Sequence, residues 1–250
     1  MNKTKVLILG GTGEARELAR RSVELFADDA EIISSQAGVT QDPEEVAGRV
    51  ISGGFGGIQG LTGFIKREQV RVVIDATHPF AETISDNAYI ACTGTSALRM
   101  MLVRPSWKLP PGGRWVEVED LTSAAEDLSK FASKALITTG RRGLDAFSHL
   151  DDIRFFVRMI EAPDAPLPLK NHQLILARPP FALEAERALL EDHQIDVLVS
   201  KHSGGAASMT KITAALDAGI PIILLRRPPR LPGLWTETVD DCLQWLQGQV

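Results

Sequence analysis

The sequence predicts an α/β protein with two domains, each a parallel sheet covered by helices on both faces, and a ligand cleft between them. Short aliphatic runs alternate with amphipathic stretches at helical spacing, which is the pattern of strand–helix–strand units. Residues 104–114 (RPSWKLPPGGR) interrupt this alternation with a segment that suits neither a helix nor a central strand. Because the alternation then restarts, we expect a first domain of residues 1–110 and a second of residues 111–250.

The first domain is expected to begin with a strand at Val6–Leu9, a continuous aliphatic run typical of a strand buried on both faces. A helix over Gly13–Phe26 follows, because its apolar side chains recur at helical spacing. Further strands are expected at Glu31–Ser35, Val70–Asp75 and Leu98–Val103, and further helices at 56–68 and Ala81–Cys92.

The second domain repeats the pattern with six expected strands and four expected helices. The strands are Trp115–Val118, Ala135–Thr139, Arg154–Arg158, Leu174–Arg178, Asp196–Lys201 and Pro221–Leu225. The helices begin at Leu121 or cover 180–191, 206–218 and 239–247. In open parallel sheets ligands bind beyond the carboxyl ends of the strands, so the residues that leave the strands are the ones to inspect for function.

The composition argues against several classes of protein. With 44% hydrophobic residues, the chain has enough apolar surface to fold. Its net charge of −5 is unlike the basic balance of a nucleic-acid-binding protein. No apolar stretch approaches the roughly 20 residues of a membrane helix or resembles a signal peptide, so we expect a cytoplasmic protein without a membrane partner. Cys92 and Cys242 show no metal spacing and are expected to be buried thiols; we expect no metal site.

The first strand is followed by a glycine loop, GGTGEA, at residues 10–15. Glycines here let the backbone turn tightly and approach a phosphate, and the amides and dipole of the next helix favour its negative charge. The loop differs from the G-x-G-x-x-G fingerprint because Arg16 stands at the third glycine position. We expect Gly10, Gly11, Thr12, Gly13 and Glu14 to bind a cofactor; the alternative is a tight turn without a ligand.

The second strand ends in Ser34 and Ser35, whose hydroxyls could donate to a 2′-phosphate. No acidic residue stands at this end to grip the ribose hydroxyls of NAD, so NADP is allowed. The GGFGG stretch at 53–57 fits a flexible loop and a backbone pressed against a planar ligand equally well.

The strand at Val70–Asp75 is followed by DATHPFA at residues 75–81. Asp75 could cap the turn, and Thr77 could bond backbone groups. His78 could donate a proton near neutral pH, and it could equally be structural.

Two strand exits in the second domain combine hydroxyl side chains, glycine, a cation and the start of a helix. The first runs from Thr138 to Gly143, and the second from Ser200 to Gly205 before a helix carrying Thr210 and Lys211. Together these groups predict a cradle for anionic groups; the alternative is solvated surface charge. The residues expected in the cradle are Thr139, Gly140, Arg141, Ser200, Lys201, Ser203 and Gly204.

Three familiar catalytic signatures are missing. Thr93 stands four residues after Tyr89, the only tyrosine, so the Tyr-x-x-x-Lys pair of short-chain dehydrogenases is absent. The sequence contains neither a G-x-x-x-x-G-K-[ST] phosphate loop nor a G-x-S-x-G nucleophile elbow.

Taken together, these motifs resemble the precorrin-6A reductase family of cobalamin biosynthesis. The matching pieces, in chain order, are GGTGEA at 10–15, GGFGG at 53–57, DATHPFA at 75–81, RPSW at 104–107, TTGR at 138–141 and SKHSGG at 200–205. The resemblance implies two Rossmann-like domains and a reductase that delivers hydride from a pyridine nucleotide to a carbon–carbon double bond of a tetrapyrrole macrocycle, giving precorrin-6B. It also implies that Arg104, Arg141 and Lys201 meet substrate carboxylates, while Gly11, Thr12 and Gly13 meet the cofactor.

One departure from the family concerns the cofactor. Members often carry an S-x-A-G-R stretch after the second strand, whereas this chain reads Ser35-Gln36-Ala37-Gly38-Val39. NADPH is therefore the preferred cofactor and NADH the alternative, as in the cobalt-containing anaerobic branch. The GGFGG stretch looks more like the metal-free, aerobic branch.

A mechanism follows as a hypothesis. The cofactor and the macrocycle meet in the cleft, closure of the domains aligns the hydride with its acceptor carbon, and His78, Asp75 or water supplies the proton. The rival interpretations are a two-domain nucleotide-dependent transferase, such as a glycosyltransferase, and a nucleotide sensor without catalysis.

Overall fold

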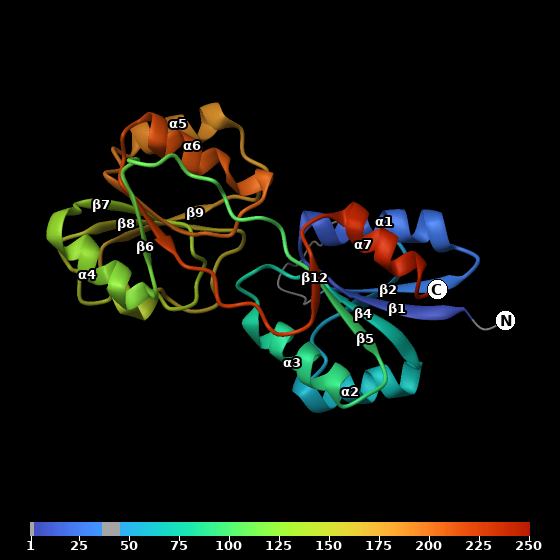
Figure 1. Ribbon diagram of the computed structural model, residues 1–250. Helices are drawn as coiled ribbons and strands as arrows, with labels where there is room; N and C mark the ends of the chain where they lie inside the picture. The colour runs from blue at the N-terminus through green and yellow to red at the C-terminus, as the bar shows by residue number, and fades with distance from the viewer. Residues whose placement is uncertain (1–2, 37–45) are drawn as a thin grey trace. The chain divides into compact units, whose positions relative to one another are not determined.

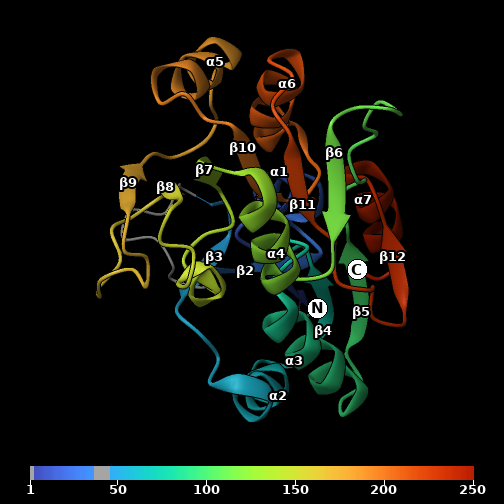
Figure 2. The same ribbon diagram turned by 90° about the vertical axis from the view of Figure 1, so that its left-hand side faces the viewer.

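The computed structural model describes residues 3–36 and 46–250. The chain forms two compact units, each with its own sheet and helices (Figures 1 and 2). Unit 1 comprises Met1–Pro105 together with Pro228–Val250, and unit 2 comprises Ser106–Arg227.

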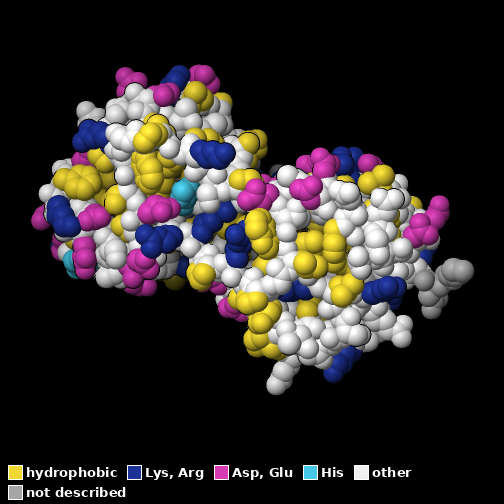
Figure 3. Space-filling model, viewed as in Figure 1, with side chains coloured by type: hydrophobic (Ala, Val, Ile, Leu, Met, Phe, Trp, Pro, Cys, Tyr) yellow, Lys and Arg dark blue, Asp and Glu magenta, His cyan; other side chains and the backbone are white. Residues whose placement is uncertain are grey.

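Charged side chains of both signs are interspersed on the face of unit 2 that Figure 3 shows. Unit 2 also carries exposed ion pairs, such as Lys170–Asp151 with 2.8 Å between Nζ and Oδ2. Within the described part of the chain, every helix is too short or too polar to cross a membrane.

Unit 1 contains a six-stranded, wholly parallel sheet in the order β12-β5-β4-β1-β2-β3. The strands are β1 (Thr4–Leu9), β2 (Ala30–Gln36), β3 (Arg49–Ser52), β4 (Val70–Asp75), β5 (Leu98–Leu102) and β12 (Leu234–Thr236). The helices are α1 (Gly13–Phe26), α2 (Gly57–Glu68), α3 (Glu82–Thr93) and α7 (Val239–Gln247). The helix expected over Gly13–Phe26 and the strand expected over Val70–Asp75 are confirmed to the residue.

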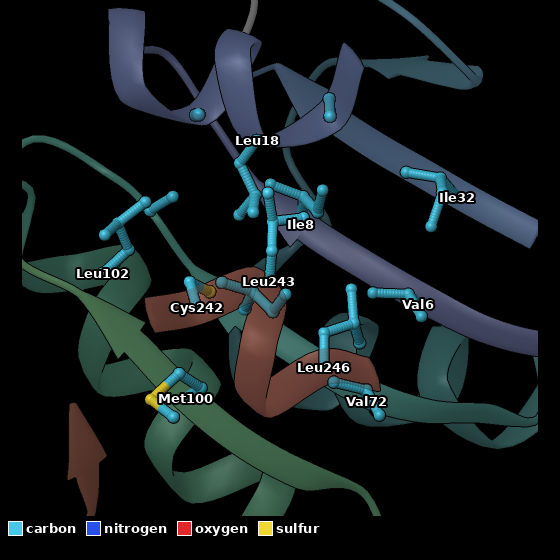
Figure 4. Close-up of a cluster of buried hydrophobic side chains, with 14 of the residues drawn as sticks. Val6, Ile8, Leu18, Ile32, Val72, Met100, Leu102, Cys242, Leu243 and Leu246 are labelled. Atoms are coloured by element: carbon cyan, nitrogen blue, oxygen red, sulfur yellow. The ribbon is translucent and has the colours of Figure 1, made fainter. Parts of the chain in front are cut away.

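Helices cover both faces of this sheet, α1 and α7 on one and α2 and α3 on the other (Figure 1). Alternate residues of β1 serve the two cores: Val6 and Ile8 face α1 and α7, while Leu7 and Leu9 face α2 and α3. This double burial is why β1 is aliphatic throughout. Figure 4 shows the first of these cores, where Cys242 is among the buried side chains.

The C-terminal segment requires a correction to the expected second domain of residues 111–250. Strand β12 pairs with β5, with Leu234 beside Met100, and α7 places Leu246 in the core of unit 1. The segment therefore completes the first sheet, because β12 pairs along the edge of β5 that no other described strand of unit 1 occupies and α7 packs into the core of that unit. Periodicity predicts a helix at 239–247 correctly, but it carries no information about which sheet that helix covers.

Unit 2 contains a second six-stranded parallel sheet, in the order β6-β11-β10-β7-β8-β9. The strands are β6 (Trp115–Val118), β7 (Lys134–Ile137), β8 (Arg154–Met159), β9 (His172–Leu176), β10 (Val197–Lys201) and β11 (Ile222–Leu225). Helix α4 (Leu121–Phe131) and the 3-10 helix η1 (Leu144–Phe147) cover one face, and α5 (Leu183–Asp192) and α6 (Thr210–Asp217) cover the other. The helix expected at 206–218 is divided into a 3-10 turn, η2 (Ala206–Ser208), and α6.

Each sheet has a point where the direction of strand succession reverses. In unit 1 the chain proceeds from β1 to β2 and β3 on one side, and from β4 to β5 and β12 on the other. In unit 2 it proceeds from β7 to β8 and β9 on one side, and from β10 to β11 on the other. Ligands of open α/β sheets bind at such points. The reversals lie between β1 and β4 in unit 1 and between β7 and β10 in unit 2. The glycine loop and DATHPFA follow β1 and β4, and the two exits singled out in the second domain follow β7 and β10.

Both cysteines are buried and free, as expected. Burial raises the pKa of the Cys92 thiol to about 11 and that of the Cys242 thiol to about 12. Both side chains therefore stay uncharged and act as small apolar groups in the two cores of unit 1.

Candidate functional site

The glycine loop after β1 has its shape for two local reasons. Gly11 has a φ of +106°, which L side chains rarely adopt, and a Cβ built there would meet nothing within 4 Å. A Cβ at Gly10 would lie 3.1 Å from the carbonyl oxygen of Ser35, to which the Gly10 amide donates at 2.9 Å. The loop therefore lies close against β2 and leaves open space beside Gly11, which suits a ligand that approaches the backbone.

Thr12 is the N-cap residue of α1 and connects the loop after β1 with the loop after β4. Its Oγ1 accepts a hydrogen bond from the Ala15 amide at 3.1 Å and donates to the carbonyl of Ala76, after β4, at 2.7 Å. The side chain is buried and its hydroxyl serves the fold. Any contact between Thr12 and a cofactor must come from the backbone, whose first-turn amides have no partner within the helix.

Glu14 and Arg104 form an ion pair at the start of α1. Nη1 of Arg104 lies 3.2 Å from Oε2 of Glu14, and the Arg104 side chain is only 14% exposed. Arg104, which the resemblance assigns to the substrate, thus follows β5 in unit 1 and stands beside the glycine loop. Its positive charge offsets a carboxylate that would otherwise oppose an anion at this helix terminus.

The two serines at the end of β2 are both buried. The Ser34 hydroxyl donates to the Ala47 carbonyl at 3.3 Å. Successive side chains of a strand point to opposite faces, so Ser34 and Ser35 are directed to different sides of the sheet. Residues 37–39 of the family stretch lie outside the described residues.

The GGFGG stretch leads into α2, and Gly53, Gly56 and Gly57 all have positive φ, between +79° and +95°. The backbone conformation alone thus explains why glycine occupies these three positions. A contact with a planar ligand stays a prediction.

Asp75 at the end of β4 organises the turn that follows. Its Oδ1 accepts from the amide of Thr77 at 3.2 Å and from the Thr77 hydroxyl at 2.7 Å. The Thr77 hydroxyl also lies 3.3 Å from Oγ of Ser85 on α3. Asp75 is 4% exposed, and its two hydrogen bonds to Thr77 stabilise this turn. The Thr77 hydroxyl takes part in the same network.

His78 is half-buried in the same turn. Its Nδ1 accepts a hydrogen bond from the Phe80 amide at 3.2 Å, so the hydrogen of the neutral ring lies on Nε2. The turn therefore selects the neutral tautomer in which Nε2 can donate a hydrogen bond. His78 and Gly11 follow neighbouring strands, and the Thr12–Ala76 hydrogen bond joins their two loops.

In unit 2, the exits of β7 and β10 are adjacent, as expected. The Thr138 amide donates to the carbonyl of Val199 on β10 at 2.9 Å. Thr139 is 3% exposed, and its Oγ1 has no hydrogen-bond partner among the described residues. The hydroxyl of Thr210, at the start of α6, is also buried and has no hydrogen-bond partner among the described residues. Because unsatisfied buried hydroxyls are rare, the Thr139 hydroxyl beside Gly140 (φ +87°) is a candidate donor to a ligand.

Lys201 ends β10 and is half-buried. Burial lowers the pKa of its amine, and the positive charge of Arg142 lowers it further. Arg142 is exposed, with no ion-pair or hydrogen-bond partner in residues 3–36 and 46–250. These two cations and Thr139 all belong to the exits of the adjacent strands β7 and β10, and such a set suits an anionic group.

Arg141, which the sequence singled out instead of Arg142, has a different environment. Its side chain is 59% exposed, and Nη1 lies 3.7 Å from the fully exposed Asp164. Exposed pairs of this kind contribute little to stability. The structure thus separates two adjacent arginines, of which Arg142 is electrostatically linked to Lys201.

The serines and Gly204 of the second exit shape the loop after β10. Ser200 is completely buried and Ser203 is 4% exposed, with its hydroxyl 3.4 Å from Oγ of Ser208. Gly204 has a φ of +66°, and its carbonyl accepts from the Ser208 hydroxyl at 3.1 Å.

Sequence reasoning missed the side chains that hold this loop. Glu117, Trp107 and Arg227 all contact residues 202–205. The signal for two of these contacts is in the motifs RPSW and SKHSGG, which contain Trp107 and His202. No sequence pattern marks Glu117 or Arg227.

Within the described ranges, no group of three or more His, Cys, Asp or Glu side chains is placed to hold a metal ion. The site residues instead form two sets, one in each unit. The set in unit 1 offers a helix terminus and a histidine, and the set in unit 2 offers cations and hydroxyls.

Comparisons with known proteins agree with one another. A family model described as precorrin-6x reductase CbiJ/CobK matches residues 5–247. The chain is 44% identical over 238 residues to a precorrin-6A reductase of Rhodococcus erythropolis, covering 95% of this chain and 94% of that protein. It is 30% identical over 260 residues to a cobalt-precorrin-6A reductase of Priestia megaterium, covering 98% of each. The solved structure of CobK precorrin-6A reductase matches with a TM-score of 0.91 at 34% identity, over 98% of this chain and 97% of that chain.

Proposed function

Because the chain belongs to the precorrin-6x reductase CbiJ/CobK family, we propose that it reduces precorrin-6A to precorrin-6B with hydride from NADPH. The observation that carries this proposal is the 44% identity to a precorrin-6A reductase over 95% of the chain. Both sets of site residues lie inside the matched length. The lower identity to the cobalt-precorrin-6A reductase, 30%, favours the metal-free substrate.

The glycine loop and the first turn of α1 are suited to the cofactor. The open space beside Gly11 and the amides at the start of α1 fit the pyrophosphate of a dinucleotide. Arg104 offsets the charge of Glu14, so the carboxylate does not repel the phosphates. When bound, the reduced nicotinamide supplies the hydride.

We assign the phosphorylated nucleotide, NADPH, from the end of β2. The last residues of that strand are Ser34, Ser35 and Gln36, so no carboxylate stands there to repel a 2′-phosphate. An acidic residue at this position would favour NADH instead.

The second set of residues is suited to the carboxylates of a tetrapyrrole. Lys201 and Arg142 supply positive charge, and the Thr139 hydroxyl supplies a buried donor without a partner in the described chain. Each charge-assisted hydrogen bond contributes about 1.5–3 kcal/mol. A few such bonds hold a polyanion on a chain whose net charge is −5.

Reduction of the double bond adds one hydride to one carbon and one proton to its neighbour. His78 is the proton donor in this proposal: its imidazolium form is an acid near neutral pH, and the turn that contacts Phe80 fixes the position of the ring. Asp75 fixes the turn that carries the ring, through its two hydrogen bonds to Thr77. After proton transfer, His78 recovers a proton from solvent.

The experiment is an absorbance assay at 340 nm with NADPH and precorrin-6A. The proposal expects consumption of NADPH only when the tetrapyrrole is present. Parallel reactions with NADH and with cobalt-precorrin-6A test the cofactor and the branch. A transferase would ignore reduced nicotinamides, and a sensor would bind NADPH without oxidising it; either result would exclude the reductase.

A further inference from the structure

We propose that His202 is a positioning residue, which fixes the loop Lys201–Gly205 in the shape that receives the tetrapyrrole carboxylates by bridging Glu117 on β6 and the carbonyl of Trp107. This inference rests on the proposed function, because it assigns the loop to the substrate. It gives a role in substrate binding to His202 and to its two partners, Glu117 and Trp107.

The His202 ring has an acceptor at each nitrogen. Nδ1 lies 2.5 Å from Oε1 of Glu117, and Nε2 lies 3.2 Å from the Trp107 carbonyl oxygen. The ring is stacked on the indole of Trp107, with centroids 5.5 Å apart and planes 26° apart. With its side chain only 11% exposed, His202 is enclosed by protein and presents neither nitrogen to a ligand. Its role is therefore to fix the conformation of the loop and not to take part in the reaction.

The backbone of the loop is fastened by the same neighbours. The Trp107 indole donates to the Gly205 carbonyl at 2.9 Å. Arg227 donates through Nε to the His202 carbonyl at 2.8 Å and through Nη2 to the Ser203 carbonyl at 2.7 Å. Trp107 and Arg227 lie at the two ends of unit 2, so the segments that begin and end this unit both converge on the loop.

These contacts have a consequence for anion binding. Every carbonyl from Lys201 to Gly205 accepts a hydrogen bond, those of Lys201 and Gly204 from the Ser203 amide and the Ser208 hydroxyl. Carbonyl oxygens carry partial negative charge and would repel a carboxylate. With all of them engaged inside unit 2, the loop presents the Lys201 ammonium to the ligand instead.

The geometry also assigns a charge to the ring. A neutral imidazole has one donor nitrogen, so only the imidazolium can donate to both Glu117 and Trp107. The charged groups around it are Glu117, Arg226 (Nε 3.9 Å from Oε2 of Glu117), Arg227 and the adjacent Lys201. Loss of either contact of the ring therefore loosens the loop and weakens substrate binding.

The test compares steady-state kinetics of His202→Gln, Glu117→Gln and the double variant with those of the wild type. His149→Gln is the control, because His149 is an exposed histidine of the same unit. Loss of a hydrogen bond to a charged group predicts a rise of about tenfold in KM for precorrin-6A in each single variant. The double variant should be no worse than either single variant, since both changes break the same bridge. KM for NADPH should stay unchanged.

The contrast between the two KM values separates positioning from a general loss of structure. A general loss of structure would raise KM for NADPH and lower kcat as well, whereas loss of positioning raises KM for precorrin-6A alone. Glu117→Gln is nearly isosteric, so it provides the test even where the histidine variant fails to fold. An unchanged tetrapyrrole KM in Glu117→Gln, with normal wild-type turnover, overturns this inference alone. A wild-type protein that never oxidises NADPH with precorrin-6A overturns the proposed function, and this inference with it.

Discussion

Two neighbouring arginines show how strongly the environment of a side chain decides its role. Arg141 and Arg142 follow the same strand, and the family motif TTGR, which ends at Arg141, favours the first of them. In the structure, Arg141 is paired with an exposed aspartate, while the charge of Arg142 acts on Lys201. The choice between them depends on which way each side chain leaves the loop.

Arg142→Ala should therefore raise KM for precorrin-6A by about tenfold, as expected for loss of one charge-assisted contact. Arg141→Ala is the matched control and should leave KM nearly unchanged, because the Arg141 side chain is exposed and pairs with a surface carboxylate. Steady-state kinetics with varied tetrapyrrole check both variants. Equal effects of the two substitutions would remove Arg142 from the substrate site.

Gly11→Val should abolish binding of the dinucleotide. The new side chain would fill the open space beside the loop and strain a φ of +106°. Gly63→Ala in α2 is the control, because a Cβ there meets nothing within 4 Å and the helix is far from the loop in sequence. Fluorescence titration with NADPH measures both affinities, and wild-type affinity in a folded Gly11→Val protein would contradict the assignment.

His78→Ala should lower the single-turnover rate of hydride transfer by about a hundredfold, the usual size of a general-acid contribution, with smaller effects on binding. His78→Asn distinguishes the proton from the turn, because its side-chain oxygen can accept from the Phe80 amide but its amide is not an acid. Both variants should be slow. Recovery of the wild-type rate in His78→Asn would make the ring structural.

At the scale of single residues, the sequence indicates candidate loops for the site but not which of their atoms are available to a ligand. Thr12 belongs to the cofactor motif, yet its hydroxyl is used by Ala15 and Ala76. Arg104 was assigned to the substrate, yet it pairs with Glu14 beside the cofactor loop. Such hydrogen-bond partners are distant in sequence, so no local pattern predicts them.

The secondary structure was largely predictable, and the exceptions have physical causes. Strands buried on both faces, such as β1, produce unmistakable aliphatic runs. Strand β3 (Arg49–Ser52) was missed because it is a short edge strand with mostly exposed side chains. Strand β12 was missed because it has only three residues and follows a proline-rich segment.

The C-terminal helix gives the prediction that belongs to the scale of elements. Leu246→Ala in α7 should destabilise unit 1 by about 2–5 kcal/mol, because this fully buried leucine packs into the core shared with α1. Gln244→Ala, at an exposed position of the same helix, should have little effect. Denaturant unfolding followed by fluorescence measures both. A Leu246→Ala protein as stable as the wild type would contradict the assignment of α7 to the core of unit 1.

For the whole molecule, sequence reasoning identified two α/β units and placed the site residues at strand exits. It could not assign the C-terminal residues to unit 1, because pairing of β12 with β5 joins segments more than 130 residues apart. The reversal of strand order in each sheet explains why the candidate site residues could be predicted from the sequence. In a parallel sheet, residues that leave adjacent strands at a reversal must converge, so separated motifs in the sequence become neighbours in each unit.

The central claim is that hydride passes from a nicotinamide nucleotide to the tetrapyrrole on this chain. The direct measurement uses NADPH carrying deuterium on the transferred position, with precorrin-6A as acceptor and mass spectrometry of the product. One deuterium should appear in each molecule of precorrin-6B, with the second hydrogen coming from solvent. A reduced product without the label, or an unreduced tetrapyrrole after prolonged incubation, would contradict the account.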